Sequence, residues 1–359
     1  MTVVTAETRL DLTALARGFP VILTTTAWLA LVGARAFVGV GEALVAFGIA
    51  AVVPLGLHVG ARSRPETSPP TKLEHVANRI VVAVGPLGVL SFAFPPGKAA
   101  ALLASAWLVA TLVVGLAGGA RMVRRRVLPL EELAIDVARL YLPIGAVWLV
   151  ASRAGVALLG FREPIVLYTA AHFHFAGFAA PTVVGLMGRD LVVGAESPAE
   201  KKPWAYSVAA CVVMAGVPLV AAGIALSRSL ETPSAILLGL GMLQLSGFLM
   251  FAGLRRLFRP IAVPPLTAFE RVRWRVSGLC LFVSGFSLVG SMMLAIAFAV
   301  TGSAGRGATD GLIPYATMAA FHGLANAIGF ATMAFLGFFL SPKALERAEQ
   351  GQEVEGVIP

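Results

Sequence analysis

The sequence predicts an all-α fold, a polytopic membrane bundle of about ten transmembrane helices. Of the 359 residues, 58% are hydrophobic and only 13% are charged, whereas soluble globular domains carry about 25% charged residues. The mean hydropathy is +0.85, and long apolar runs recur along the whole length. One anchoring helix does not produce such values, so we expect a multi-pass membrane protein whose main partner is the lipid bilayer.

The individual spans follow from apolar stretches of about 20 residues, the length that crosses a bilayer as a helix. Short polar links with Gly, Pro and Arg separate them, and no gap is long enough for a soluble domain. This predicts one transmembrane domain over residues 1–359. The ten predicted spans are 18–34, 37–60, 79–96, 99–120, 130–152, 163–188, 204–227, 233–254, 277–300 and 313–340.

The distribution of basic residues predicts that both termini face the cytoplasm. In this orientation 21 of the 28 Lys and Arg residues fall on the inner side, six on the outer side and Arg139 within a span. Such a bias is typical of the cytoplasmic loops of membrane proteins. The same loops explain the net charge of +9, so we expect no nucleic-acid partner.

The first span has a second interpretation. A basic start with Arg9 and Arg17, a short apolar run and "ARA" at 34–36 are also typical of a cleaved secretory signal. However, Glu7 dilutes the basic start, Arg35 lies within the supposed cleavage site, and another span follows at once. We therefore treat residues 18–34 as a retained span.

Few ionisable residues are predicted at membrane depth, where each is costly and is by default a functional hypothesis. His172 and His174 lie in the sixth span, His322 in the tenth, and Asp136 and Arg139 in the fifth. Asp136 and Arg139 are three residues apart near the cytoplasmic edge, a spacing that favours an ion pair. Two interpretations of this pair stay open, a snorkelling pair at the interface and an inner gate.

Helical geometry separates the two histidines of "AHFHF". Residues two apart on an α-helix point about 200° apart, so His172 and His174 cannot bind one metal ion from a regular helix. His174 shares its face with a stripe of small residues that includes Gly177 and Gly185, which favours close packing of another helix. His172 shares its face with Tyr168, one turn earlier, and this spacing permits a hydrogen bond.

His322 is predicted at the same depth as His172. Spans six and ten both run from outside to inside, and each histidine lies nine residues beyond the predicted start of its span. This depth is about 13–14 Å from the outer edge, near the bilayer middle. Asn326 lies one turn beyond His322, and Tyr315 shares that face. Contact between the two spans therefore brings these side chains together near the midplane.

Three interpretations of His172, His174 and His322 stay open. They hydrogen-bond within the protein and hold helices together, or they line a polar site for a proton, small solute or ion, or they ligate haem or a transition metal. The third is suggested because "AHFHF" resembles a short string in haem-copper oxidase subunit I. No cofactor is predicted outright. Imidazole changes charge near physiological pH, which favours transport coupled to histidine protonation.

The sequence favours a transporter over an enzyme, because it contains no P-loop, GxSxG or HExxH pattern. A non-catalytic membrane sensor or partner protein is a further alternative. An internal repeat of residues 79–188 and 204–340 is also predicted, since "AHFHFAG" and "AFHGLAN" end two blocks of four spans. This repeat aligns Phe173-His174 with Phe321-His322. Duplicated halves that meet at a central site are typical of transporters.

Four stretches resemble the bacterial YndJ-like membrane proteins, and the resemblance covers most of the chain. The resemblance implies a multi-pass protein of the bacterial cytoplasmic (inner) membrane, in a family usually described as transporters without an established substrate. It implies no established role for any residue. The four stretches are "YLPIGAVWLVASRAGVALLGF" at 141–161, "LYTAAHFHFAGFAAPTVVGLMGR" at 167–189, "VVPLGL" at 52–57 and "FHGLANAIGF" at 321–330.

Overall fold

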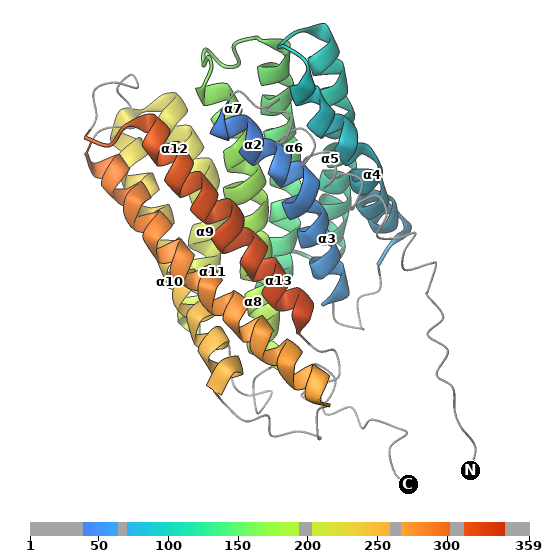
Figure 1. The fold of residues 1–359 in the computed structure, drawn as a ribbon, viewed down its shortest axis with the longest axis vertical. Helices are drawn as coiled ribbons and strands as arrows, with labels where there is room; N and C mark the ends of the chain where they lie inside the picture. Colours follow the sequence, from blue (N-terminus) through green and yellow to red (C-terminus); the bar gives the residue numbers. More distant parts are fainter. Residues whose placement is uncertain (1–38, 64–69, 194–202, 259–266, 302–311, 342–359) are drawn as a thin grey trace.

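The described chain forms one bundle of long helices (Figure 1). The computed structural model describes residues 39–63, 70–193, 203–258, 267–301 and 312–341. In these ranges the only strand-like feature is an isolated β-bridge between Leu158 and Phe161. The predicted all-α fold is therefore confirmed.

Three of the membrane-length helices consist of an α-helix, a π-helical segment and a second α-helix. The elements are α2 (Val40–Phe47), η1 (Gly48–Val52), α3 (Val53–Arg62), α4 (Lys72–Leu90), the short 3₁₀ turn η2 (Ser91–Ala93), α5 (Lys98–Arg124), α6 (Leu130–Ala154), α7 (Ile165–His172), η3 (Phe173–Ala179), α8 (Ala180–Val193), α9 (Trp204–Leu226), α10 (Arg228–Phe258), α11 (Ala268–Val300), α12 (Tyr315–Leu324), η4 (Ala325–Thr332) and α13 (Met333–Leu340).

Nine helices in the described ranges are long and apolar enough to cross a membrane, and they correspond to predicted spans two to ten. The predicted first span, 18–34, lies outside the described residues. The count of ten, the cytoplasmic position of both termini and the single domain over 1–359 therefore stay predictions. The nine spans are Val40–Arg62, Lys72–Ala93, Lys98–Arg124, Leu130–Ala154, Ile165–Leu191, Trp204–Leu226, Ser229–Phe258, Ala268–Val300 and Ala316–Leu340.

Local sequence explains where several helices begin and end. Thr71 and Thr267 each precede a helix in a capping box, in which Glu74 or Glu270 exchanges hydrogen bonds with the threonine. α6 ends at Gly155, whose φ of 72° lies in the left-handed region that glycine adopts without strain. The ends at Thr71 and Gly155 lie close to charged residues that are described below.

Each π-helical segment lies in the middle of its span. Pro54 follows η1 and Pro181 follows η3 by two residues, and proline lacks the N–H that a regular α-helical hydrogen bond needs. In η4 the Thr332 hydroxyl donates to the carbonyl of Ala327, five residues back, at 2.8 Å. The segments η1, η3 and η4 contact one another. The centre of the bundle is therefore irregular in three helices at once.

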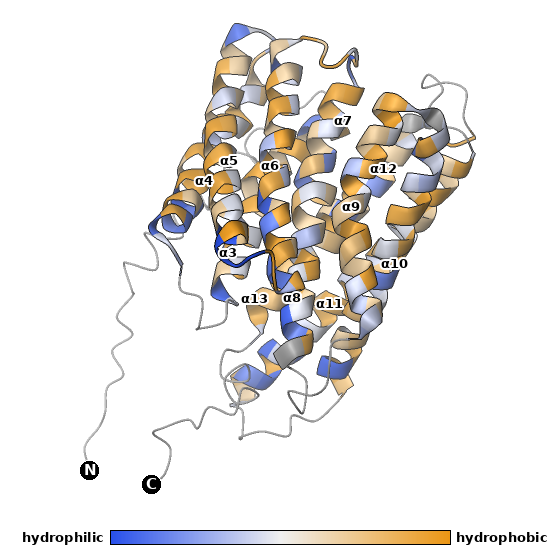
Figure 2. Cartoon of the chain, turned by 180° about the vertical axis from the view of Figure 1, so that it is seen from behind, coloured by the Kyte–Doolittle hydropathy of each residue, from blue (hydrophilic) through white to orange (hydrophobic). Residues whose placement is uncertain are grey.

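The helix α7–η3–α8 is the central helix of the bundle. In its most apolar stretch 89% of the residues are buried, compared with 72% for α2–η1–α3 and 33% for α11. Hydrophobic residues dominate the middle of the helices, and hydrophilic residues gather near the helix ends (Figure 2). Polar side chains on the central helix therefore face other helices rather than lipid.

Candidate functional site

His174 is completely buried in η3 and uses both ring nitrogens within the protein. Its Nε2 lies 3.1 Å from the indole Nε1 of Trp107, and its Nδ1 lies 2.7 Å from the carbonyl oxygen of Ala170. An indole N–H only donates and a carbonyl only accepts, so Nε2 is the acceptor and Nδ1 carries the proton. His174 is thus a neutral, structural hydrogen-bond partner, and neither nitrogen is available to a metal ion or haem.

Glycines let the neighbouring helices approach His174 closely. A Cβ at Gly48 would lie 3.2 Å from the His174 Cβ, and a Cβ at Gly145 would lie 3.1 Å from Nδ1. Gly177 and Gly185, the glycines of the predicted small-residue stripe, lie against α6. The close packing that the stripe predicts is therefore observed, and α6 is the helix that packs there.

Trp107→Phe is expected to lower the free energy of unfolding by about 1–3 kcal/mol, because it leaves the buried Nε2 of His174 without its donor. Thermal unfolding of the detergent-solubilised protein measures the change. Trp204→Phe is the matched control, because Trp204 is 77% exposed, and it should leave the unfolding temperature unchanged. Equal unfolding temperatures for Trp107→Phe and the wild type would show that the indole does not hold His174.

His322 belongs to a second hydrogen-bonded group, with Ser291 of α11 and Asn326 of η4. Its Nδ1 lies 3.1 Å from the carbonyl oxygen of Ser291 and 2.9 Å from the Ser291 hydroxyl. Because the carbonyl only accepts, Nδ1 carries the proton and Nε2 keeps its lone pair. Asn326 donates to the Ser291 hydroxyl at 2.5 Å and to the His322 carbonyl at 2.8 Å. The orientation of the His322 ring is therefore fixed.

His172 ends α7 and has different surroundings from His174. Its Nε2 is buried and has no hydrogen-bond partner in the described ranges. The Phe173 ring packs edge-on at a centroid distance of 6.1 Å. The segment η3, which follows His172, contacts η4, which follows the helix that carries His322. The two spans that carry these histidines therefore contact each other, and a direct contact between the two rings stays a prediction.

The predicted pairing of the tyrosines with the histidines stays a prediction. Tyr168 packs against Gly41 of α2, and Nε2 of His172 has no hydrogen-bond partner in the described ranges. Tyr315 begins α12, but its side chain lies outside the described part of the chain. Among the described residues no three His, Cys, Asp or Glu side chains are grouped to hold a metal ion.

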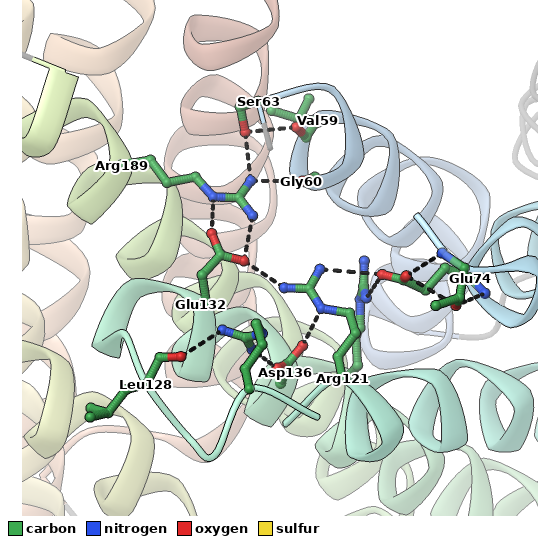
Figure 3. A network of polar contacts seen from close by, with 12 residues as sticks. Val59, Gly60, Ser63, Glu74, Arg121, Leu128, Glu132, Asp136 and Arg189 are labelled. Carbon is green, nitrogen blue, oxygen red and sulfur yellow. Dashed lines mark hydrogen bonds and ion pairs between the residues drawn. The ribbon is translucent and has the colours of Figure 1, made fainter. Parts of the chain in front are cut away.

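A buried ionic network lies where α5 ends and α6 begins (Figure 3). Arg121 lies 2.5 Å from Glu132, 2.9 Å from Asp136 and 3.4 Å from Glu74. Arg139 lies 3.2 Å from Glu74. These five side chains are at most 6% exposed. Buried charges are stable only when they are paired, so α4, α5 and α6 depend on one another at this end.

The predicted ion pair between Asp136 and Arg139 is wrong. Within the described residues Asp136 pairs with Arg121 and Arg125, and Arg139 pairs with Glu74. Neither side chain snorkels to the interface, because Asp136 is 0% and Arg139 2% exposed. Partners from α4 and α5 replace the neighbour on the same helix, and helix spacing alone does not reveal them.

Arg189 extends the network to α8 and α3. Its Nε and Nη2 lie 2.6 and 2.8 Å from the two carboxylate oxygens of Glu132, a bidentate arrangement. Its Nη1 donates to the Gly60 carbonyl at 2.7 Å and to the Ser63 hydroxyl at 2.9 Å. Glu132 also binds Arg121, so one carboxylate links α5, α6 and α8.

A narrow gap lies along the central helix between His174 and Arg189. It has no room for a water molecule. Arg139 reaches the gap from the ionic network, and Thr182 reaches it from the central helix. The lining residues are Gly56, Leu57, Gly60, Ile135, Arg139, Phe178 and Thr182.

Several residues of the site carry little signal in the sequence. Trp107 and Ser291 are ordinary residues of apolar spans, and only their tertiary contacts reveal them. The basic run that contains Arg121 and Arg125 reads as a cytoplasmic loop. The chain has only 19 Asp and Glu residues, and several of them begin the next span. These acidic residues were the signal from which the ionic network could have been predicted.

Comparisons with known proteins agree with a membrane bundle. The family described as YndJ-like protein matches residues 43–330. The uncharacterized membrane protein YndJ of Bacillus subtilis (strain 168) is 26% identical over 232 residues. The match covers 65% of this chain but only 37% of that protein. No solved structure matches the chain significantly. Because the family matches most of its length, this chain belongs to the YndJ-like family.

Proposed function

We propose that this protein is a proton-coupled transporter of a small solute or ion, with His172 and His322 as the coupling site. The proposal rests on the buried Nε2 of His172, which bonds to no described group, in a span whose segment η3 contacts η4 of the span that carries His322. A buried polar atom without a partner costs about 1–3 kcal/mol, so its presence requires an explanation. Ionisable residues inside membrane spans typically mark proton or substrate pathways.

The chemistry of the two rings supports a shared proton. The Nδ1–H of His322 is held by the Ser291 carbonyl, so this ring accepts a further proton at Nε2. His172 has an uncommitted Nε2 in the same region. Two positive rings side by side repel each other, so the pair is expected to hold one proton at a time. His174 is excluded from this role by its bonds to Trp107 and Ala170.

The π-helical segments support a site that rearranges. π-helical turns are rare and occur frequently at functional sites. Here η1, η3 and η4 contact one another, His172 directly precedes η3, and Asn326 lies within η4. Small helix shifts are a common element of conformational switching. We therefore expect changes in histidine protonation to alter the packing of these three helices.

The buried ionic network is proposed as the inner gate, the role considered above for Asp136 and Arg139. A narrow gap beside Arg139, Phe178 and Thr182 lies between the network and the central helix. Arg189 and Glu132 close the same end through α3, α6 and α8. Opening the gate requires these charges to exchange their partners for water.

The location of the protein is also part of the proposal. We assign the ionic network to the cytoplasmic end, because the links at this end carry most of the Lys and Arg residues. With this orientation we assign the protein to the bacterial cytoplasmic (inner) membrane, with both termini inside.

The proposal is tested by proton flux into liposomes that contain the purified protein and a pH-sensitive dye. A membrane potential drives protons inward, with and without a small-molecule extract of bacterial cells outside. We expect faster acidification than in protein-free liposomes in at least one of these two conditions. Acidification at the protein-free rate in both conditions would refute proton-coupled transport.

A further inference from the structure

Two groups of four helices pack in the same way, and a further element lies between them. α4, α5, α6 and α7–η3–α8 pack in chain order, as do α9, α10, α11 and α12–η4–α13. The last helix of each group contains a π-helical segment. α2 contacts both α7 and α12, and η1 contacts both η3 and η4 (Figure 1). The helix α2–η1–α3 therefore lies between the two groups.

Glycine contacts repeat in register between the groups. Gly185 of α8 lies against the carbonyl of Glu131 in α6, and Gly337 of α13 lies against the carbonyl of Ser277 in α11. Equivalent contacts in the two groups are related by two constant offsets. The glycine of the second group lies 152 positions after the glycine of the first group (337 − 185). The residue that it contacts lies 146 positions after the equivalent residue of the first group (277 − 131). Further contacts with these offsets are Gly185–Ile135 with Gly337–Leu281, and Gly177–Tyr141 with Gly329–Ser287.

The π-helical segments follow the same register. His174 donates from Nδ1 to the carbonyl of Ala170, four residues back, at 2.7 Å. Asn326 donates from Nδ2 to the carbonyl of His322, also four residues back, at 2.8 Å. His174 and Asn326 therefore occupy equivalent positions, and both hold a carbonyl beside a π-helical segment.

This register supports the predicted repeat of residues 79–188 and 204–340 but changes its alignment. His174 corresponds to Asn326 rather than to His322. The position equivalent to His172 is Leu324, so the proposed coupling pair is not duplicated. The structural polar groups repeat, whereas the residues proposed for coupling do not.

The helix α2–η1–α3 is tied to its neighbours at both ends. At the end with the ionic network, Arg189 of α8 donates to the Gly60 carbonyl at 2.7 Å and to Ser63 at 2.9 Å. At the opposite end, Glu42 of α2 lies 3.2 Å from Arg153 of α6. The predicted orientation makes this opposite end the outer one. Polar ties therefore fasten the helix on both sides of the histidines.

Arg153 is held in place independently of Glu42. Its Nη2 donates to the Phe94 carbonyl at 2.6 Å, and its guanidinium lies 5.0 Å from the centroid of the Phe92 ring. The Arg153 side chain is 3% exposed, whereas that of Glu42 is 16% exposed. Breaking the ion pair therefore removes one polar contact between α2 and α6, while Arg153 stays anchored to the loop after α4.

We propose that the solute path follows α2–η1–α3 between the two helix groups, and that the Glu42–Arg153 ion pair is its outer gate. Gly48 and Gly56 face the central helix, so small residues line the contact along which α2–η1–α3 moves. The inner gate at Arg189 and the outer gate at Arg153 then open at different times, which gives alternating access to the histidines. The path depends on the proposed transport function, whereas opening of the outer end is measurable without it.

The experiment measures water access to a cysteine beside the outer gate. Leu44 is 4% exposed and packs against Gly323, so Leu44→Cys reports opening between α2 and α12. The variant is made in a Cys211→Ser, Cys280→Ser background and placed in nanodiscs. The rate of reaction with a membrane-impermeant maleimide is recorded. Glu42→Gln is expected to raise this rate about tenfold by populating the open state.

Three further variants make this result decisive. Arg162→Gln removes an exposed charge at the same end and should leave the rate unchanged. Glu42→Arg combined with Arg153→Glu restores an ion pair and should restore the slow rate. Glu42→Asp keeps the charge but shortens the side chain, and it replaces Glu42→Gln where that protein is not monodisperse.

The possible results separate the gate from the transport function. An unchanged rate in a folded Glu42 variant, or a fast rate in the charge-swapped protein, would overturn the outer gate. Faster labelling in a protein that carries no protons would retain the gate and refute proton-coupled transport.

Discussion

Glu132→Gln is expected to lower the free energy of unfolding by about 3–5 kcal/mol, the cost of breaking a buried ion pair from one side. The Glu132 carboxylate contacts Arg189 at 2.6 and 2.8 Å and Arg121 at 2.5 Å. Glutamine keeps the volume but removes the charge that the two buried guanidinium groups share. The bonds from Arg189 to Gly60 and Ser63 go to neutral groups and do not replace the lost carboxylate charge.

Thermal unfolding in one detergent, followed by circular dichroism, measures this loss. Glu163→Gln is the matched control, because Glu163 is exposed and a glutamine can still accept the hydrogen bond from the backbone of Leu167. We expect Glu163→Gln to unfold at the wild-type temperature. A Glu132→Gln protein as stable as this control would show that the network does not hold α5, α6 and α8 together.

His172→Ala and His322→Ala are each expected to lower the protein-dependent proton flux about 100-fold, the range that a positioned proton-transfer group contributes. Each substitution removes one of the two rings that the proposal assigns to a single proton. Because the two residues act as one unit, the double variant is expected to lose no more flux than either single variant.

His75→Gln is the control for the histidine variants, because His75 is exposed near the start of α4. Its proton flux should equal that of the wild type. Thermal unfolding of each histidine variant checks that a lost flux does not come from a protein that fails to fold. Wild-type flux in either His172→Ala or His322→Ala would refute the coupling site.

The spans were predictable because the bilayer imposes a simple length and polarity rule. An apolar run of about 20 residues is both necessary and readable in sequence, so all nine described spans coincide with predicted ones. The π-helical segments were not predicted. Pro54 and Pro181 lie within predicted spans, but a proline alone does not distinguish a kink from a π-turn.

The contact between spans six and ten could be anticipated from the sequence, but its details could not. Helix rise placed His172 and His322 at equal depth, and the segments η3 and η4 of these two spans contact each other. His174 is a structural residue because its Nε2 accepts a hydrogen bond from Trp107, which lies 67 residues away in the sequence. Likewise, the proton on His322 is assigned by the carbonyl of Ser291 on another helix. Such contacts follow from tertiary packing and carry no local pattern.

The partners within the ionic network could not be predicted from the sequence. Counting Arg121 and Arg125 as loop charges predicted the orientation, yet both reach carboxylates of the next helix. The positive-inside rule treats such residues as solvated. In the structure the ends of α5 and α8 and the starts of α4 and α6 converge, so charges near the membrane edge become buried partners.

The most direct test of the central claim is nitrogen NMR of the protein labelled with ¹⁵N-histidine in lipid bilayers, recorded over a series of pH values. Signals are assigned with His172→Gln, His174→Gln and His322→Gln. We expect His174 to keep a proton on Nδ1 and none on Nε2 wherever the protein is folded, because Trp107 donates to Nε2. As the pH falls, His172 and His322 should gain one proton between them. Protonation of His174 while His172 and His322 stay unchanged would contradict the account.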